Sequence, residues 1–124
     1  MKFCWVTITV KDMEESVKFY QEIVGLSENR RFNAGPEVEI VFLGNGETEI
    51  ELIHNGSSKN VDMGSAISLG FEVNSIEEKF EFIEEKGLSV IGRIFQPNQN
   101  VKFFYVMDPN GLKIQFVENI IHNS

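Results

Sequence analysis

The sequence predicts an α+β protein made of two tandem βαβββ modules, because the chain repeats itself and each copy shows the same local pattern. Sliding the 124-residue chain along itself aligns Thr7–Leu26 with Gly70–Leu88. A self-similar period of this length is typical of a duplicated structural unit. We therefore expect one domain spanning 1–124, with module one at 1–62 and module two at 63–124.

Each copy is expected to begin with a strand followed by a helix. Phe3–Val10 alternates and is rich in β-branched and aromatic residues, which favours a strand. Asp12–Glu15 and Ser75–Glu78 have the capping-box pattern that opens a helix. Apolar residues then recur at helical spacing, and Gly25 and Gly87 stand where a left-handed C-cap is expected.

Three strand-like segments follow the helix in each copy. They are Ser27–Phe32, Glu37–Leu43 and Glu47–His54 in the first copy, and Val90–Gln96, Val101–Met107 and Leu112–Glu118 in the second. Gly44–Gly46 and Asp108–Gly111 have hairpin-turn composition. Two such modules predict an eight-stranded curled sheet around a cavity, and that cavity is the expected binding site.

Composition limits the partners and the compartment. The net charge is -8 and basic residues do not cluster beyond Arg30-Arg31, so we expect no nucleic acid partner. No apolar run approaches the ~20 residues that span a bilayer, so we expect no membrane association. A single cysteine, Cys4, and no secretory signal predict a cytoplasmic protein. Cys4 stands beside Phe3 and Trp5, and we expect it to be packed and unreactive.

Because side chains alternate along a strand, equivalent positions of the two modules are expected to face the cavity together. Trp5 then corresponds to Ser68, since 68 minus 5 is 63, and Glu51 corresponds to Gln115, since 115 minus 51 is 64.

Four segments carry a resemblance to a known family. WVTITVKDMEESVKFYQEIVGL, EIELIHN, AISLGFEV and DPNGLKIQFVE resemble, in order and spacing, the vicinal-oxygen-chelate superfamily, and bacterial glyoxalase I most closely. The resemblance covers essentially the whole chain and implies paired βαβββ modules and a homodimer. In the glyoxalase branch it also implies a divalent metal held by His, Glu, His and Glu. Carried over by position, these ligands would be Trp5, Glu51, Ser68 and Gln115.

These four positions depart from the metal-binding pattern. Indole has no lone pair for a metal, and serine hydroxyl and amide oxygen are weak ligands, so Glu51 is the single good ligand. Tight zinc or nickel binding needs about four. His54 is expected on the opposite strand face from Glu51, and His122 lies in the polar tail. We therefore expect no metal and no other cofactor, and an organic ligand beside Trp5.

Glu51 has two interpretations. Partial burial in the cavity would raise its pKa and make it a candidate catalytic base, whereas an ion pair would keep it ionised and structural. The possible partners of such a pair are Arg30, Arg31, Arg93 and Lys113.

The remaining candidate ligand-binding residues are Ser68 and Gln115 as hydrogen-bonding groups, Trp5 as a stacking surface, and Tyr105. Tyr105 and Phe103 share one face of their strand, and the sequence leaves open whether that face looks inward.

Three functions follow from this set of residues. The first is a metal-independent protein that binds a small organic molecule, similar to the bleomycin-resistance branch. The second is a lyase, isomerase or dioxygenase, either metal-dependent or using Glu51 as base, although glyoxalase I activity itself is not expected. The third is an interaction module without an active site. Fold alone does not choose between them.

Overall fold

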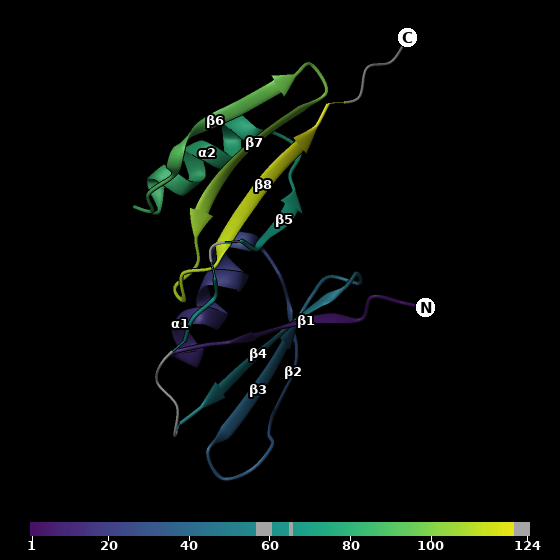
Figure 1. Cartoon of the computed structure of the whole chain (residues 1–124), viewed down its shortest axis with the longest axis vertical. Helices are drawn as coiled ribbons and strands as arrows, with labels where there is room; N and C mark the ends of the chain where they lie inside the picture. Colours follow the sequence, from purple (N-terminus) through teal and green to yellow (C-terminus); the bar gives the residue numbers. More distant parts are fainter. Residues whose placement is uncertain (57–60, 65, 121–124) are drawn as a thin grey trace. The chain divides into compact units, whose positions relative to one another are not determined.

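The computed structural model describes residues 1–56, 61–64 and 66–120. The chain divides into two compact units, 1–62 and 63–124. Each unit is a strand, a helical segment and three further strands, so the predicted βαβββ modules are confirmed (Figure 1). That the two modules form one domain stays a prediction, and His122 lies outside the described residues.

Module one is a four-stranded sheet with one helical segment. Its elements are β1 (Trp5–Thr9), α1 (Met13–Lys18), the π-helical turn η1 (Phe19–Val24), β2 (Glu28–Asn33), β3 (Val38–Leu43) and β4 (Glu49–Asn55). The strand order is β1-β4-β3-β2. β1 runs parallel to β4, and the other neighbours are antiparallel.

Module two repeats this topology. Its elements are β5 (Ser68–Glu72), α2 (Ile76–Glu85), β6 (Ile91–Asn98), β7 (Val101–Met107) and β8 (Lys113–Asn119). The strand order is β5-β8-β7-β6, with β5 parallel to β8. The eight strands are therefore arranged as two open four-stranded sheets of the same topology.

One face of each sheet packs against its own helical segment. In module one Ile8, Val41 and Leu52 are at most 2% exposed. In module two Phe104 and Phe116 are fully buried, and Phe80 of α2 meets the Phe104 ring edge-on at 5.4 Å between centroids. Burial of each such side chain contributes about 1.5–3 kcal/mol. The opposite face of each sheet carries no helix of its own module and is open (Figure 1).

Both helix starts are capped as the sequence predicts. The Asp12 carboxylate accepts a hydrogen bond from the backbone N–H of Glu15 at 3.0 Å. The Ser75 hydroxyl accepts one from the N–H of Glu78 at 3.2 Å. Each cap satisfies a donor that the first helical turn leaves unpaired. Among the described residues, no helix is both long and apolar enough to cross a membrane.

The π-helical turn of module one accommodates one residue that module two lacks. In both modules the leucine after the helix donates its N–H to a carbonyl near the helix end. Leu26 donates to Tyr20, six residues back, whereas Leu88 donates to Ile83, five residues back. The wider π turn therefore absorbs the additional residue and leaves the strands that follow in equivalent places.

The hairpin turn between β7 and β8 is closed by a buried aspartate. Oδ1 of Asp108 accepts hydrogen bonds from the N–H groups of Asn110 and Leu112, each at 2.8 Å. Gly111 follows with φ of 89°, a left-handed conformation that glycine adopts without strain. The turn that the sequence predicts at 108–111 is therefore present.

The packed environment expected for Cys4 is wrong, because Cys4 is exposed. Strand β1 begins one residue later, at Trp5. Cys4 therefore belongs to an N-terminal segment beyond the core, in which Phe3 is 68% exposed.

Candidate functional site

Trp5 and Glu51 share the open face of the module one sheet. In the parallel β1–β4 ladder Thr7 lies opposite Glu51, and Trp5 is two residues before Thr7. In the β3–β4 ladder Phe42 lies opposite Glu51. Directly opposite residues point to the same side of a sheet, as do residues two apart on one strand. Trp5, Thr7, Phe42 and Glu51 therefore form one surface.

Glu51 is half-buried, and a threonine is its hydrogen-bond partner. The Thr7 hydroxyl donates to Oε1 of Glu51 at 2.6 Å. Arg30, one of the expected partners, instead pairs with Glu49, with 3.4 Å between Nη2 and Oε1. The sequence reasoning missed Thr7, although the parallel pairing of the two strands was a signal that could have found it.

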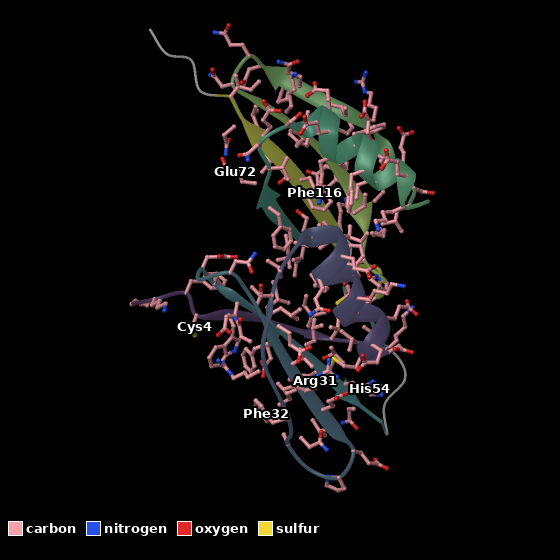
Figure 2. The ribbon with its side chains drawn as sticks, turned by 180° about the vertical axis from the view of Figure 1, so that it is seen from behind. Cys4, Arg31, Phe32, His54, Glu72 and Phe116 are labelled. Atoms are coloured by element: carbon pink, nitrogen blue, oxygen red, sulfur yellow. The ribbon has the colours of Figure 1, made fainter. Side chains whose placement is uncertain are left out.

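Arg31 and His54 lie on the helix-covered side of the module one sheet. Arg31 contacts Glu14 of α1 at 2.6 Å, and Nδ1 of His54 lies 3.4 Å from the carbonyl oxygen of Val10. Figure 2 shows Arg31 near α1 and the neighbouring Phe32 on the other side of its strand. The expected placement of His54 away from Glu51 agrees with the regular register of β4.

Trp5 presents an indole ring at the edge of an aromatic cluster. Its ring meets Phe42 edge-on, with 5.2 Å between centroids and an interplanar angle of 77°. The guanidinium carbon of Arg30 lies 3.8 Å from the centroid of the same Phe42 ring. Trp5 is 43% exposed whereas Phe42 is buried. The Trp5 ring therefore packs against Phe42 on one side, and the rest of the ring is exposed.

The candidate residues of module two also share an open face. Gln115 lies opposite Tyr105 on β7 and opposite Gly70 on β5, and Ser68 is two residues before Gly70. The Gln115 amide donates to the Tyr105 hydroxyl at 3.3 Å. Tyr105 therefore lies on the open side of the sheet, and Phe104 lies in the core between the sheet and α2. That the open side faces a cavity stays a prediction.

Gly70 occupies in module two the position that Thr7 occupies in module one. A Cβ atom at Gly70 would lie 3.1 Å from Oε1 of Gln115, which is tighter than ordinary contact. The glycine therefore lets the amide rest against the β5 backbone. Ser68 is exposed at the start of β5.

The four positions do not fit the metal that the family resemblance implies. Glu51 is the single anionic side chain at them, and its Oε1 is hydrogen-bonded to Thr7. The described ranges of the chain contain no group of three or more His, Cys, Asp or Glu side chains able to hold a metal ion. Indole, hydroxyl and amide groups are poor ligands for zinc or nickel. That the four positions share one cavity stays a prediction.

A family model described as the Glyoxalase/Bleomycin resistance protein/Dioxygenase superfamily matches residues 2–116 of the chain. The chain belongs to this superfamily. This membership agrees with the two modules of βαβββ topology and with the resemblance in the sequence.

Several proteins of this superfamily are similar to the chain along most of their length. The lactoylglutathione lyase of Neisseria meningitidis serogroup A is 29% identical over 126 residues, which cover 95% of this chain and 91% of that protein. The lactoylglutathione lyase of Haemophilus influenzae is 30% identical over 131 residues, covering 96% and 93%.

Solved structures of the superfamily share the fold. A glyoxalase family protein from Bacillus cereus has a TM-score of 0.83 at 20% identity, covering 98% of this chain and 95% of that one. The trypanothione-dependent glyoxalase I of Leishmania major has a TM-score of 0.82 at 22% identity, covering 95% and 86%. At these identities the likeness shows the fold alone.

Proposed function

We propose that this glyoxalase-superfamily protein binds a small, planar, positively charged organic molecule on the open face of module one. The observation that carries the proposal is that an exposed indole, Trp5, and a half-buried carboxylate, Glu51, share this face. An aromatic ring and a carboxylate are the two groups that recognise an organic cation.

The charge on Glu51 is available to a ligand. Its hydrogen bond from Thr7 holds the carboxylate in place without neutralising it. Arg30, the nearby cation of this face, already pairs with Glu49. The net charge of -8 also favours the approach of a cation.

NMR titration with three compounds of matched shape tests this proposal. Trp5 is the sole tryptophan, so its indole N–H gives a single resonance. We expect benzamidinium to shift that resonance, and neutral benzamide or anionic benzoate to shift it far less. Replacing Glu51→Gln should weaken benzamidinium binding about tenfold, the effect of one charge-assisted hydrogen bond.

Glu22→Gln is the matched control, because Glu22 is an exposed glutamate on η1 of the same module. This variant should bind benzamidinium as the unmodified protein does. Equal responses to benzamidinium and benzamide, or unchanged binding after Glu51→Gln, would contradict the proposal.

A second candidate function is an enzyme, and the similarity to lactoylglutathione lyases supports it. Glu51 would then act as the base. The donor set at the four family positions argues against a metal-dependent version. Incubation with the hemithioacetal of methylglyoxal and glutathione, with and without added zinc or nickel, tests this candidate. Turnover abolished by Glu51→Gln would establish it.

The interaction module without an active site is the remaining alternative, and binding or turnover that depends on Glu51 would exclude it.

The superfamily resemblance also leads us to propose a homodimer in the cytoplasm. Light scattering on the purified protein measures the oligomeric state.

A further inference from the structure

We propose that Asn45 is a site of spontaneous deamidation in the folded protein, and that its conversion to aspartate or isoaspartate detaches the β3–β4 hairpin of module one from the end of η1. The site lies within a single module, in the turn between β3 and β4. It does not rest on the binding function proposed for Trp5 and Glu51.

Deamidation is an attack within the chain. The backbone nitrogen of the next residue forms a bond to Cγ of the asparagine, the bond from Cγ to Nδ2 breaks, and ammonia leaves. Water then opens the resulting five-membered imide at one of its two carbonyl carbons, which gives aspartate or isoaspartate. A following glycine favours the attack, because it has no side chain to obstruct the nitrogen and its backbone turns freely.

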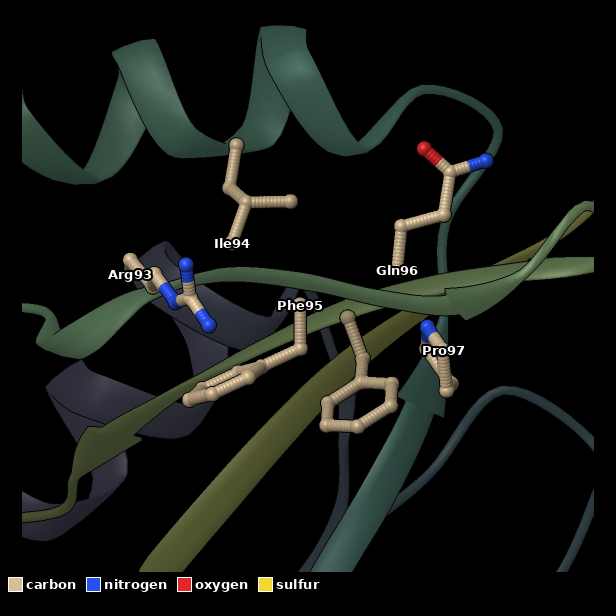
Figure 3. Close-up of a pocket in the computed structure, with 6 residues that line it drawn as sticks. Arg93, Ile94, Phe95, Gln96 and Pro97 are labelled. Atoms are coloured by element: carbon tan, nitrogen blue, oxygen red, sulfur yellow. The ribbon is translucent and has the colours of Figure 1, made fainter.

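Three asparagines of the chain are followed by glycine, namely Asn45, Asn55 and Asn110. Their local sequences offer the same reaction, so the structure has to rank them. Other side-chain amides are less suited to it. Gln96, which Figure 3 shows directed toward the helix, is followed by Pro97, and proline has no N–H with which to attack.

The nitrogen that would attack Asn45 is that of Gly46. Within the described ranges of the chain, the N–H of Gly46 makes no hydrogen bond. Gly46 is exposed, and a Cβ atom added to it would have no atom within 4 Å beyond its chain neighbours. The nitrogen can therefore approach Cγ of Asn45 without leaving a partner.

The corresponding nitrogens of the two other asparagine-glycine pairs are already engaged. Gly56 donates its N–H to the carbonyl oxygen of Glu37 at 2.9 Å, and Gly111 donates its N–H to that of Asp108 at 3.2 Å. Asn110 is also only 6% exposed, and its Nδ2 donates to Oδ2 of Asp108 at 3.2 Å. Each nitrogen has to leave its hydrogen bond before it can attack, so both pairs should react more slowly.

Two hydrogen bonds hold the side chain of Asn45, and we call them the Asn45 bridge. Ser27 donates its N–H to Oδ1 at 2.9 Å, and Nδ2 donates to the carbonyl oxygen of Gly25 at 2.9 Å. Gly25 is the C-cap of η1, and Ser27 stands directly before β2. The Asn45 bridge therefore ties the β3–β4 hairpin to the end of η1.

The Asn45 bridge leaves the attacking nitrogen free and favours the attack. Oδ1 is the atom on which negative charge develops when Cγ is attacked, and the N–H of Ser27 already donates to it. The reaction then removes half of the bridge, because Nδ2 leaves as ammonia. An oxygen takes its place opposite the carbonyl oxygen of Gly25, so two acceptors face each other without a hydrogen. Isoaspartate also adds one methylene to the main chain of the turn.

Ageing of the purified protein at mildly alkaline pH, followed by peptide mass spectrometry, tests the site. Each deamidation adds one dalton to its peptide. In the folded protein we expect Asn45 to deamidate at least about fivefold faster than Asn55 or Asn110, the effect of one hydrogen bond at the attacking nitrogen. In urea the three rates should converge, because the three pairs are then equally exposed. Asn45 reacting no faster than the other two in the folded protein, or the same ranking in urea, would overturn the proposal.

Asn45→Asp reproduces one product and tests its effect on the hairpin. We expect the thermal unfolding midpoint to fall by about 4 °C, as the loss of one hydrogen bond predicts. The N–H of Gly44, which donates to the carbonyl oxygen of Ser27 at 2.9 Å, should exchange with solvent faster than in the unmodified protein. Gln21→Glu is the matched control, because it converts an exposed amide of η1 to a carboxylate and should leave both measurements unchanged. Equal behaviour of the two variants would show that the Asn45 bridge does not hold the hairpin, and would overturn the proposal.

Discussion

The hydroxyl of Thr7 donates a 2.6 Å hydrogen bond to Oε1 of Glu51 across the parallel ladder of β1 and β4. The bond joins residues 44 positions apart in the chain, so it exists only once the sheet has formed. It fixes the direction of the one carboxylate at the four family positions.

We expect Thr7→Val to weaken benzamidinium binding several-fold, because a carboxylate that is free to rotate loses more entropy when it binds a ligand. Valine keeps the shape and strand preference of threonine, so the thermal unfolding midpoint should change little. Thr9→Val, two residues along the same strand face, is the control. Equal affinities for both variants would show that the Thr7 hydroxyl does not position Glu51.

Arg31 links three carboxylates on the helix-covered side of module one. Its guanidinium lies 2.6 Å from Glu14, 2.9 Å from Glu28 and 3.2 Å from Glu39. The hydrogen bond from Arg31 lowers the pKa of the Glu28 carboxyl below its ordinary value of 4.5. The same interactions raise the pKa of the Arg31 guanidinium.

We expect Arg31→Met to lower the free energy of unfolding by about 1 kcal/mol at neutral pH, since these pairs are partly exposed and screened by solvent. Because the pKa of Glu28 is lowered by folding, its contribution is present above pH 4.5 and is lost as the pH falls through the lowered value. Urea unfolding at pH 7 and pH 3 should therefore show a smaller difference at pH 3. Two results would contradict this account. One is an Arg31→Met loss of unfolding free energy that is as large at pH 3 as at pH 7, and the other is an equal loss in Lys18→Met.

Deletion of Gln21 tests whether η1 holds an additional residue. Gln21 is an exposed residue within the π turn. Without it, the turn should become α-helical, as in module two, and circular dichroism should show a folded protein with moderate loss of stability. Deletion of Glu81 from α2 should be far more damaging, because it turns buried Ile83 away from the core. Equal losses of stability from the two deletions would show that η1 does not hold an additional residue.

Restoring the metal ligands tests whether the four family positions meet. We expect the triple variant Trp5→His, Ser68→His, Gln115→Glu to bind one nickel or zinc ion per site. Its affinity for the metal should be at least a hundredfold higher than that of the unmodified protein. The gain follows from replacing three weak donors by imidazole and carboxylate. Adding Glu51→Gln should remove most of it. No gain in the triple variant would show that the positions do not converge.

The sequence by itself determined the order of helices and strands along the chain. The repeat predicted two βαβββ modules, and the caps at Asp12 and Ser75 and the turn at 108–111 are where local pattern placed them. These features depend on neighbours in the chain, because a helix cap or a tight turn is made within a few residues. Once the family resemblance had assigned the four ligand positions, their residue types showed the departure from a metal site.

Only the tertiary structure decided which distant side chains act together. Strand register places Thr7, rather than an arginine, beside Glu51. It also places Tyr105 on the open face. Register is set by which face of each strand is buried and by the turns that join the strands, so it is fixed only when the strands pair.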